Sequence, residues 1–363
     1  MDKLKEIFEK IKPYLGKKTT GIAVAVVVVL VIVLLLVNGM TSNKASDETA
    51  SDDVNSTTGF SSDVVRITGS TATTSSLETA NTLLKVSGAG SFDTVIVTSE
   101  QSIADALSGT YLAKVKSAPI LILSDTEDAD AAATSLNLIT NYIKSNLSTE
   151  GSIIILGGTV SVSEEAETAL TELGNVTRIA AEDRYATNLA VLNYAGTEGV
   201  ATLLVSSGTG FADSISAAST GLPILLVGDE LSYEQKVYIA NHNFTEICVL
   251  GGTAGVSDDI LATLQTYCSD VERISGDSRY ATSKAIADKF FTGSTTVCVT
   301  YGDSFAAGLA AGPVANLWNA PILLVADGSD SDAKAFISAN NVTSIVNFAT
   351  AEEISDDLMN GLK

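Results

Sequence analysis

The sequence predicts an α/β protein in which one unit of strands and helices occurs three times. Similar segments recur in the same order at intervals of roughly 100 residues, which indicates internal repetition. Within each series, apolar runs typical of strands alternate with stretches typical of helices, the pattern of βαβ crossovers in a mostly parallel sheet. The strands are almost continuous Val, Ile and Leu, as expected when helices cover both faces of a sheet. We therefore expect three compact lobes, each with its own core.

Each unit shows the same succession of predicted elements. A short strand carrying Arg-Ile opens the unit, with the arginine at Arg66, Arg178 or Arg273. An apolar strand then leads into a helix of small residues, and a further strand begins with Pro-Ile-Leu at Pro119, Pro223 or Pro321. The last strand ends in Gly-Gly-Thr in the first two units, and the third unit has lost both glycines. We predict the repeat boundaries 63–174, 175–269 and 270–363.

An apolar segment, GIAVAVVVVLVIVLLLV, precedes the repeats. With its flanking residues it is long enough to cross a hydrocarbon core about 30 Å thick, so we predict a transmembrane helix at 21–40. Lysines gather before this segment and predict that residues 1–20 are cytoplasmic and the repeats extracellular, in a single-pass cell-membrane protein. A cleaved signal peptide is the alternative, although no A-x-A site follows. The polar, acidic stretch 41–62 predicts a flexible linker.

Composition excludes several classes of function. The formal net charge of −22 repels polyanions at long range, so we expect no nucleic-acid partner. A single histidine leaves no cluster with metal-ligand spacing and no His-based catalytic triad, and we expect neither an enzyme nor a resident cofactor. Two of the three cysteines, Cys248 and Cys298, stand in strand-like apolar runs and are interpreted as buried thiols.

Several motifs together resemble the bacterial cell wall-binding repeat type 2 family, over about residues 64–361. They are RISGDSRYAT at 273–282, TRIAAEDRYAT at 177–187, the Ala-Asp helix starts, the Pro-Ile-Leu-Leu strands and the Leu-Gly-Gly-Thr loops. The resemblance implies three Rossmann- or Toprim-like parallel-sheet lobes in a pseudo-threefold arrangement. It also implies non-covalent attachment to anionic or secondary wall glycopolymers of Gram-positive bacteria by a module that is not itself catalytic. Proteins of this family are usually exported by a cleaved signal, which differs from the anchor expected here.

The candidate ligand-binding residues fall in four motifs. The guanidinium and phenol of each Arg-Tyr pair suit a bidentate grip on carboxylate or phosphate and stacking on a sugar ring. The alternative is that each arginine pairs with a helix-start aspartate across the seam between two lobes. The Gly-Gly loops permit close backbone approach at a helix N-terminus, or are simply tight turns. The full candidate set is Arg178, Arg184, Tyr185, Thr187, Arg273, Arg279, Tyr280, Thr282, Asp105, Asp213, Gly157, Gly158, Gly251 and Gly252.

The terminal repeats lack parts of these motifs. Repeat one has Ala72 and Thr73 where the Arg-Tyr pair is expected, and repeat three has Ala307 in place of the aspartate and Ala349-Thr350 in place of Gly-Gly. Such paired loss is expected if each site combines the Asp and Gly-Gly of one lobe with the Arg-Tyr of the next. The alternative is that terminal repeats erode because they cap the array.

The favoured function is a membrane-tethered envelope protein that binds cell-wall glycopolymer without catalysis. The alternatives are an extracellular scaffold that binds another protein or further copies of itself, and a wall-polymer hydrolase. Because the exported part is acidic, we also expect that divalent cations can bridge its carboxylates to an anionic polymer.

Overall fold

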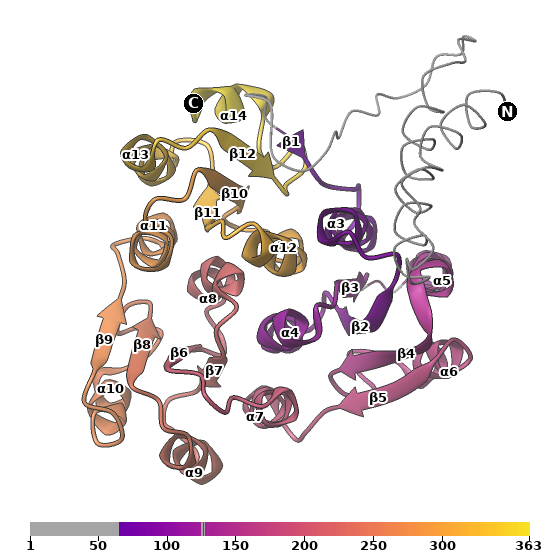
Figure 1. The fold of residues 1–363 in the computed structure, drawn as a ribbon, viewed down its shortest axis with the longest axis horizontal. Helices are drawn as coiled ribbons and strands as arrows, with labels where there is room; N and C mark the ends of the chain where they lie inside the picture. Colours follow the sequence, from indigo (N-terminus) through magenta and orange to yellow (C-terminus); the bar gives the residue numbers. More distant parts are fainter. Residues whose placement is uncertain (1–64, 125, 127) are drawn as a thin grey trace, which may run out of the picture. The chain divides into compact units, whose positions relative to one another are not determined.

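The computed structural model describes residues 65–124, 126 and 128–363, which belong to one compact unit. They form three parallel four-stranded sheets covered by helices, which confirms the three α/β lobes predicted from the sequence (Figure 1). Within this part of the chain, no helix is both long enough and apolar enough to cross a membrane. The predicted span at 21–40 and the predicted linker at 41–62 lie outside the described residues.

Each lobe contains one sheet, and the strand order is equivalent in all three. Lobe one has the order β3-β2-β4-β5, lobe two β7-β6-β8-β9 and lobe three β11-β10-β12-β1. The bounds are β2 Phe92–Ser99, β3 Ile120–Leu123, β4 Leu147–Leu156 and β5 Asn175–Ile179 in lobe one; β6 Thr202–Ser207, β7 Ile224–Val227, β8 Glu246–Leu250 and β9 Val271–Ile274 in lobe two; β10 Thr296–Tyr301, β11 Ile322–Val325, β12 Ser344–Asn347 and β1 Val65–Arg66 in lobe three.

The sequence repeats and the sheets are offset by one strand. The Arg-Ile strand that opens each repeat is the fourth strand of the preceding lobe, so β5 pairs with β4 and β9 pairs with β8. The first strand of the described chain completes the last sheet, with Val65 opposite Val346 and Arg66 opposite Asn347. Figure 1 shows the indigo β1 beside the yellow β12. The three lobes therefore form a closed ring.

The helix after each Arg-Ile strand packs on the next lobe. Helices α3, α7 and α11 pack against β3, β7 and β11 respectively, so the chain crosses a seam between the Arg-Ile strand and the Arg-Tyr helix. Side chains at the helix N-termini fix these crossings: Asp183 accepts from the backbone N–H groups of Tyr185 and Ala186, and Ser278 accepts from that of Ala281. The helices are α3 Ala72–Ser87, α4 Ile103–Lys116, α5 Ala129–Asn146, α6 Glu164–Thr171, α7 Arg184–Ala195, α8 Ala212–Ala217 with the 3₁₀ turn η2 Ala218–Thr220, α9 Tyr233–Asn241, α10 Asp258–Leu264, α11 Arg279–Phe290, α12 Ala306–Leu317, α13 Ser331–Asn340 and α14 Asp356–Gly361.

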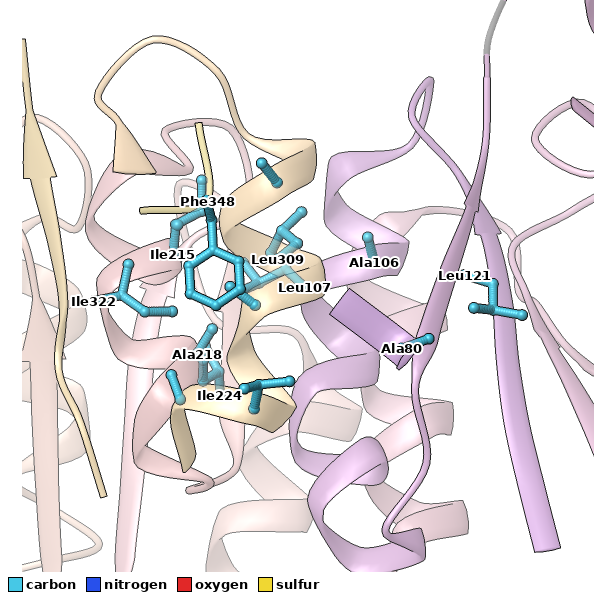
Figure 2. Close-up of a cluster of buried hydrophobic side chains, with 14 of the residues drawn as sticks. Ala80, Ala106, Leu107, Leu121, Ile215, Ala218, Ile224, Leu309, Ile322 and Phe348 are labelled. Atoms are coloured by element: carbon cyan, nitrogen blue, oxygen red, sulfur yellow. The ribbon is translucent and has the colours of Figure 1, made fainter. Parts of the chain in front are cut away.

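Helices α4, α8 and α12 meet at the centre of the ring (Figure 1). Their equivalent residues Leu107, Ile215 and Leu309 belong to one buried cluster that contains side chains of all three lobes (Figure 2). Gly308 permits the close approach of α12, because a Cβ there would lie 2.7 Å from Cγ2 of Ile215. The shared cluster joins the lobes into one folding unit.

The apolar strands form the interior, as the sequence predicted. All residues of β3, β7 and β11, which are the Pro-Ile-Leu strands, are buried, so their side chains contribute to the core. Cys248, Cys268 and Cys298 are buried free thiols, which confirms the interpretation of the two strand cysteines. Burial raises the pKa of the Cys248 thiol to about 12, with further contributions from the charges of Glu246 and Glu272.

Candidate binding site at the lobe seams

The arginines of the fourth strands bind the loops that follow the third strands. Arg178 donates from Nη1 to the carbonyl of Gly157 at 2.7 Å, and from Nη2 to the carbonyl of Val162 at 2.8 Å and to Glu167 at 2.9 Å. Equivalent bonds run from Arg273 to the Gly251 carbonyl and Asp258, and from Arg66 to the Ile354 carbonyl and Asp356. Acceptors within the protein already bind these guanidinium groups, so the arginines stabilise the loops and are not free to bind a ligand.

The first glycine of each Gly-Gly loop makes room for the helix-start aspartate. Gly157 has φ +102° and Gly251 has φ +87°, a backbone conformation that side chains disfavour. A Cβ at Gly157 would lie 2.4 Å from Oδ2 of Asp105, and one at Gly251 would lie 2.2 Å from Oδ2 of Asp213. Each aspartate therefore occupies the space that a side chain at the glycine would need.

The second glycine of each loop is under no such restriction. A Cβ at Gly158 or Gly252 would meet no atom within 4 Å, and neither residue has a positive φ. Among the described residues, these two glycines are therefore not required by packing.

Asp105 and Asp213 lie in the first turns of α4 and α8 and face the next lobe. Burial raises the pKa of both carboxyls, because desolvation disfavours the charged form. At Asp105, hydrogen bonds with Ser102 and Ser161 act against this rise in pKa, and the charge of Arg184 adds a smaller effect. At Asp213, a hydrogen bond from Thr282 and then the charge of Arg279 act against it. Each aspartate thus feels the charge of an arginine from the following repeat, but forms no ion pair with it, and Arg279 is instead paired with Asp303.

The Arg-Tyr pairs hold the loop after the central strand of their own lobe. Arg184 donates from Nη1 to the Gly208 carbonyl at 2.9 Å, and Arg279 donates to the Gly302 carbonyl at 2.6 Å and pairs with Asp303. The tyrosine rings lie over the same glycines: a Cβ at Gly208 would lie 2.3 Å from Cε1 of Tyr185, and one at Gly302 would lie 2.7 Å from Cε1 of Tyr280.

The threonines of the motif are buried and support the backbone of the crossing. Thr187 accepts from the N–H of Ala181, and Thr282 accepts from the N–H of Gly276, each at 3.0 Å. Ser75 takes the same place in the first repeat and accepts from Gly69. This equivalence confirms that the crossing is built alike at all three seams.

A pocket of about 390 Å³ opens at the seam between lobes two and three. Four candidate residues come together in its wall: Asp213 and Gly252 from lobe two, and Arg279 and Thr282 from the helix that crosses the seam. Phe305 of lobe three closes one side. The pocket therefore combines a guanidinium, a carboxylate, a hydroxyl and an aromatic ring, which suits a sugar that carries an acidic group.

The seam between lobes three and one carries an equivalent pocket of different chemistry. Its volume is also about 390 Å³, and it contains Ala72 and Ala307 where the other seams have arginine and aspartate. Glu100 and Glu353 contribute carboxylates to its wall, and Phe305 borders this pocket as well. Phe305 was not among the residues predicted from the sequence. The sequence does contain a sign of it, because phenylalanine precedes the small-residue helix in both the second and the third repeat, at Phe211 and Phe305.

One cluster at the other end of the seam between lobes two and three has donors that could hold a metal. Glu246, Cys248 and Glu272 are the members found among the described residues. The ammonium of Lys289, from α11, already lies between both carboxylates, 2.7 Å from Glu246 and in close contact with Glu272. The lysine supplies the positive charge there and joins the two lobes.

Comparison with known proteins identifies the family. The family model for cell wall binding domain 2 (CWB2) matches residues 66–167, 178–261 and 273–358. The N-acetylmuramoyl-L-alanine amidase LytC of Bacillus subtilis is 26% identical over 74% of this chain and 53% of its own length. The amidase enhancer of the same organism is 28% identical over 85% of this chain and 42% of its own length.

Two solved structures share the fold. Cwp8 from Clostridium difficile superposes with a TM-score of 0.71 at 24% identity, covering 82% of this chain and 51% of that one. Cwp6 from the same organism superposes with a TM-score of 0.69 at 22% identity, covering 90% of this chain and 53% of that one. The chain thus spans about half the length of these relatives. The family match indicates a cell-wall location, which corrects the cell-membrane location expected from the sequence. The chain belongs to the cell wall binding domain 2 family and carries three of its repeats.

Proposed function

We propose that the three-lobed domain is a non-catalytic module that binds a cell-wall glycopolymer. The observation that carries this proposal is the match of three tandem repeats to a wall-binding family, in a ring where two seams hold pockets lined by both polar and apolar groups. The named relatives are an N-acetylmuramoyl-L-alanine amidase and an amidase enhancer, and the chain spans only about half their length. The amidase activity in one relative's name is therefore not carried over.

The chemistry near Asp213 supports a binding role rather than hydrolysis. Ser206 and Ser214, two of the hydroxyls in this sequence motif, are fully buried and hydrogen-bond to each other at 2.6 Å, and the buried Ser207 accepts from the N–H groups of Thr209 and Gly210. A serine nucleophile needs an exposed hydroxyl beside a base, whereas these serines are buried and their hydrogen-bond partners are hydroxyls and backbone N–H groups.

The pocket between lobes two and three is the candidate site for a sugar unit. Arg279 is about one-third exposed, with a relative side-chain accessibility of 38%, so part of its guanidinium faces the pocket while Gly302 and Asp303 hold it in place. Such a fixed guanidinium loses little freedom on binding a carboxylate or phosphate. At the seam between lobes one and two, Arg184 is held in a similar way by the Gly208 carbonyl, and its charge acts against the rise in the pKa of Asp105.

A sedimentation assay with wall fractions tests this function. The full chain is incubated with walls before and after the secondary glycopolymers are stripped, and the bound fraction is measured in the pellet. We expect binding to intact walls and little to stripped walls. Equal binding to both would assign the ligand to peptidoglycan, and binding to neither would favour a protein-binding scaffold; either result contradicts the proposal.

A matched pair of variants tests the pocket itself. Arg279→Gln removes the charge in the pocket, whereas Lys334→Gln removes a paired charge on α13, which does not line the pocket. We expect weaker wall binding for the first variant only.

A further inference from the structure

The C-terminal ends of α4, α7 and α12 form a surface of distinct composition. We name it the lysine surface and define it by Lys114, Val115, Lys116, Tyr194 and Leu317, at the C-terminal ends of α4, α7 and α12. Lys116 is separated from the pocket end of α4 by most of the helix, about 16 Å along its axis from Asp105. Val115, Tyr194 and Leu317 are 42%, 45% and 48% exposed. The surface therefore combines cationic and apolar groups.

Contacts among these helix ends bring the members together from different lobes. The ammonium of Lys116 lies 5.8 Å from the centre of the Tyr194 ring, within the range of a cation–π interaction. A Cβ at Gly221 would lie 3.0 Å from Cγ of Lys114 and 2.5 Å from Nδ2 of Asn316, the neighbour of Leu317. Asn316 also donates to the Ser219 carbonyl at 3.0 Å, which fixes the end of α12 against η2.

The charge of the surface differs from that of the whole chain. The chain has a net charge of −22, yet among the described residues neither Lys114 nor Lys116 forms an ion pair with a carboxylate. By contrast, Arg178, Arg273 and Arg279 are all paired with acidic side chains. Lysines are favourable at helix C-termini for electrostatic reasons, but that preference does not explain the exposed apolar side chains beside them.

These observations indicate a partner that is anionic and has apolar faces. A polyanion is repelled by the acidic surface in general, so it is held where positive charge is both local and unpaired. Sugar rings offer apolar faces to tyrosine and leucine, and ammonium groups bind phosphate or carboxylate as point charges. We propose that the lysine surface binds the anionic groups of the wall glycopolymer, with Tyr194 and Leu317 against its sugar rings. This inference rests on the proposed function.

Two double variants of equal charge change test the proposal on the full chain. The first, Lys114→Glu with Lys116→Glu, reverses the charge of the lysine surface. The control, Lys144→Glu with Lys236→Glu, reverses two lysines that are likewise outside any ion pair with the described residues but lie on α5 and α9. Binding is measured with anionic glycopolymer released from walls, at low and at high salt, after circular dichroism has shown that each variant is folded.

We expect the first variant to bind at least about tenfold more weakly, as expected for the loss of charge-assisted contacts. It should also lose most of the salt dependence, whereas the control should stay within about twofold of the unsubstituted chain. If the charge-reversed protein does not fold, Lys114→Gln with Lys116→Gln against Lys144→Gln with Lys236→Gln gives the same comparison. Tyr194→Ala should weaken binding more than the control Tyr233→Ala, because Tyr233 is also exposed (76%) but lies on α9, outside the lysine surface.

The possible outcomes separate this proposal from the proposed function. Polymer binding that is equally strong in the first variant and the control overturns the lysine surface and leaves the wall-binding function intact. Equal weakening in both overturns it too, because net charge alone would then account for the effect. No binding by the unsubstituted chain contradicts the proposed function itself, and with it this inference.

Discussion

Replacing Gly251 by alanine tests whether the helix-start aspartate and the loop glycine share one space. A side chain at φ +87° costs about 1–2 kcal/mol, the penalty for left-handed backbone in an L-residue. In addition, the new Cβ would lie 2.2 Å from Oδ2 of Asp213 and displace a carboxylate that is bonded to Thr282. Loss of a hydrogen bond to a charged group costs about 1.5–3 kcal/mol. We therefore expect Gly251→Ala to lower the free energy of unfolding by about 2.5–5 kcal/mol.

The second part of this loss should disappear once the carboxylate is gone. In an Asp213→Ala background, Gly251→Ala should cost only the backbone penalty of about 1–2 kcal/mol, so the two changes should couple by about 1.5–3 kcal/mol. Urea unfolding at pH 7 measures all four proteins, and Gly252→Ala is the control because its Cβ would meet no atom within 4 Å. The reasoning is refuted if Gly251→Ala costs no more than Gly252→Ala, or the same with and without Asp213.

Three further changes test other parts of the fold. Arg66→Ala removes the bonds from β1 to the Ile354 carbonyl and Asp356, so we expect a loss of about 1–3 kcal/mol and faster amide hydrogen exchange in β12; unchanged exchange would contradict ring closure by β1. Gly308→Ala places a Cβ 2.7 Å from Ile215 in the centre and should cost about 1–3 kcal/mol in urea unfolding, and a neutral result would contradict the close helix approach. Burial raises the pKa of the Asp213 carboxyl, so its protonated form stabilises the protein below the unfolded pKa near 3.8, and this stabilisation is lost as pH rises through the folded pKa. Asp213→Asn should therefore flatten the decline of the unfolding free energy between pH 4 and 7. An unchanged slope of unfolding free energy against pH would contradict the raised pKa.

The joint loss of the aspartate and the first loop glycine in repeat three has a physical interpretation. Lobe three has Ala307 where Asp213 stands in lobe two, and Ala349 where Gly251 stands. Ala349 does not have a positive φ, so its loop follows a different path from the Gly-Gly loops. When the helix-start aspartate is absent, no carboxylate requires a glycine at the first position of the loop. When that loop position carries a side chain, the carboxylate of the aspartate has no space. The two positions are thus expected to change together within one lobe.

The sequence was sufficient to predict the lobes because burial leaves a clear pattern. Strands such as β7 and β11 are buried throughout and are continuous apolar runs, and helices such as α11 begin with a capping serine. The offset between repeats and sheets was not predictable in the same way. Periodicity shows that Arg178 and Arg273 are equivalent, but it does not show which sheet their strands join, because pairing depends on residues distant in sequence.

The candidate site was predicted in part for a similar reason. Charge types alone suggested that Asp105 and Arg184 pair across a seam, and this pairing stays a prediction: Arg184 acts on Asp105 only through its charge, while its guanidinium donates to the Gly208 carbonyl. The partners of Arg178 are mainly backbone carbonyls, which leave no residue-type signal in the sequence. The position of the Tyr185 ring over Gly208 could not be predicted from the sequence either, because a glycine can be required by a turn, a positive φ or a close approach.

The central claim is that this ring of three repeats binds a secondary glycopolymer of the cell wall. Titration calorimetry of the full chain with glycopolymer released from walls and purified free of peptidoglycan tests it most directly. We predict saturable binding that weakens as salt is raised, because an anionic ligand is held partly by charge. Low salt strengthens the long-range repulsion between the acidic chain and an anionic polymer as well as the local attraction. Absence of saturable binding at every salt concentration, with and without added divalent cation, would therefore contradict the claim.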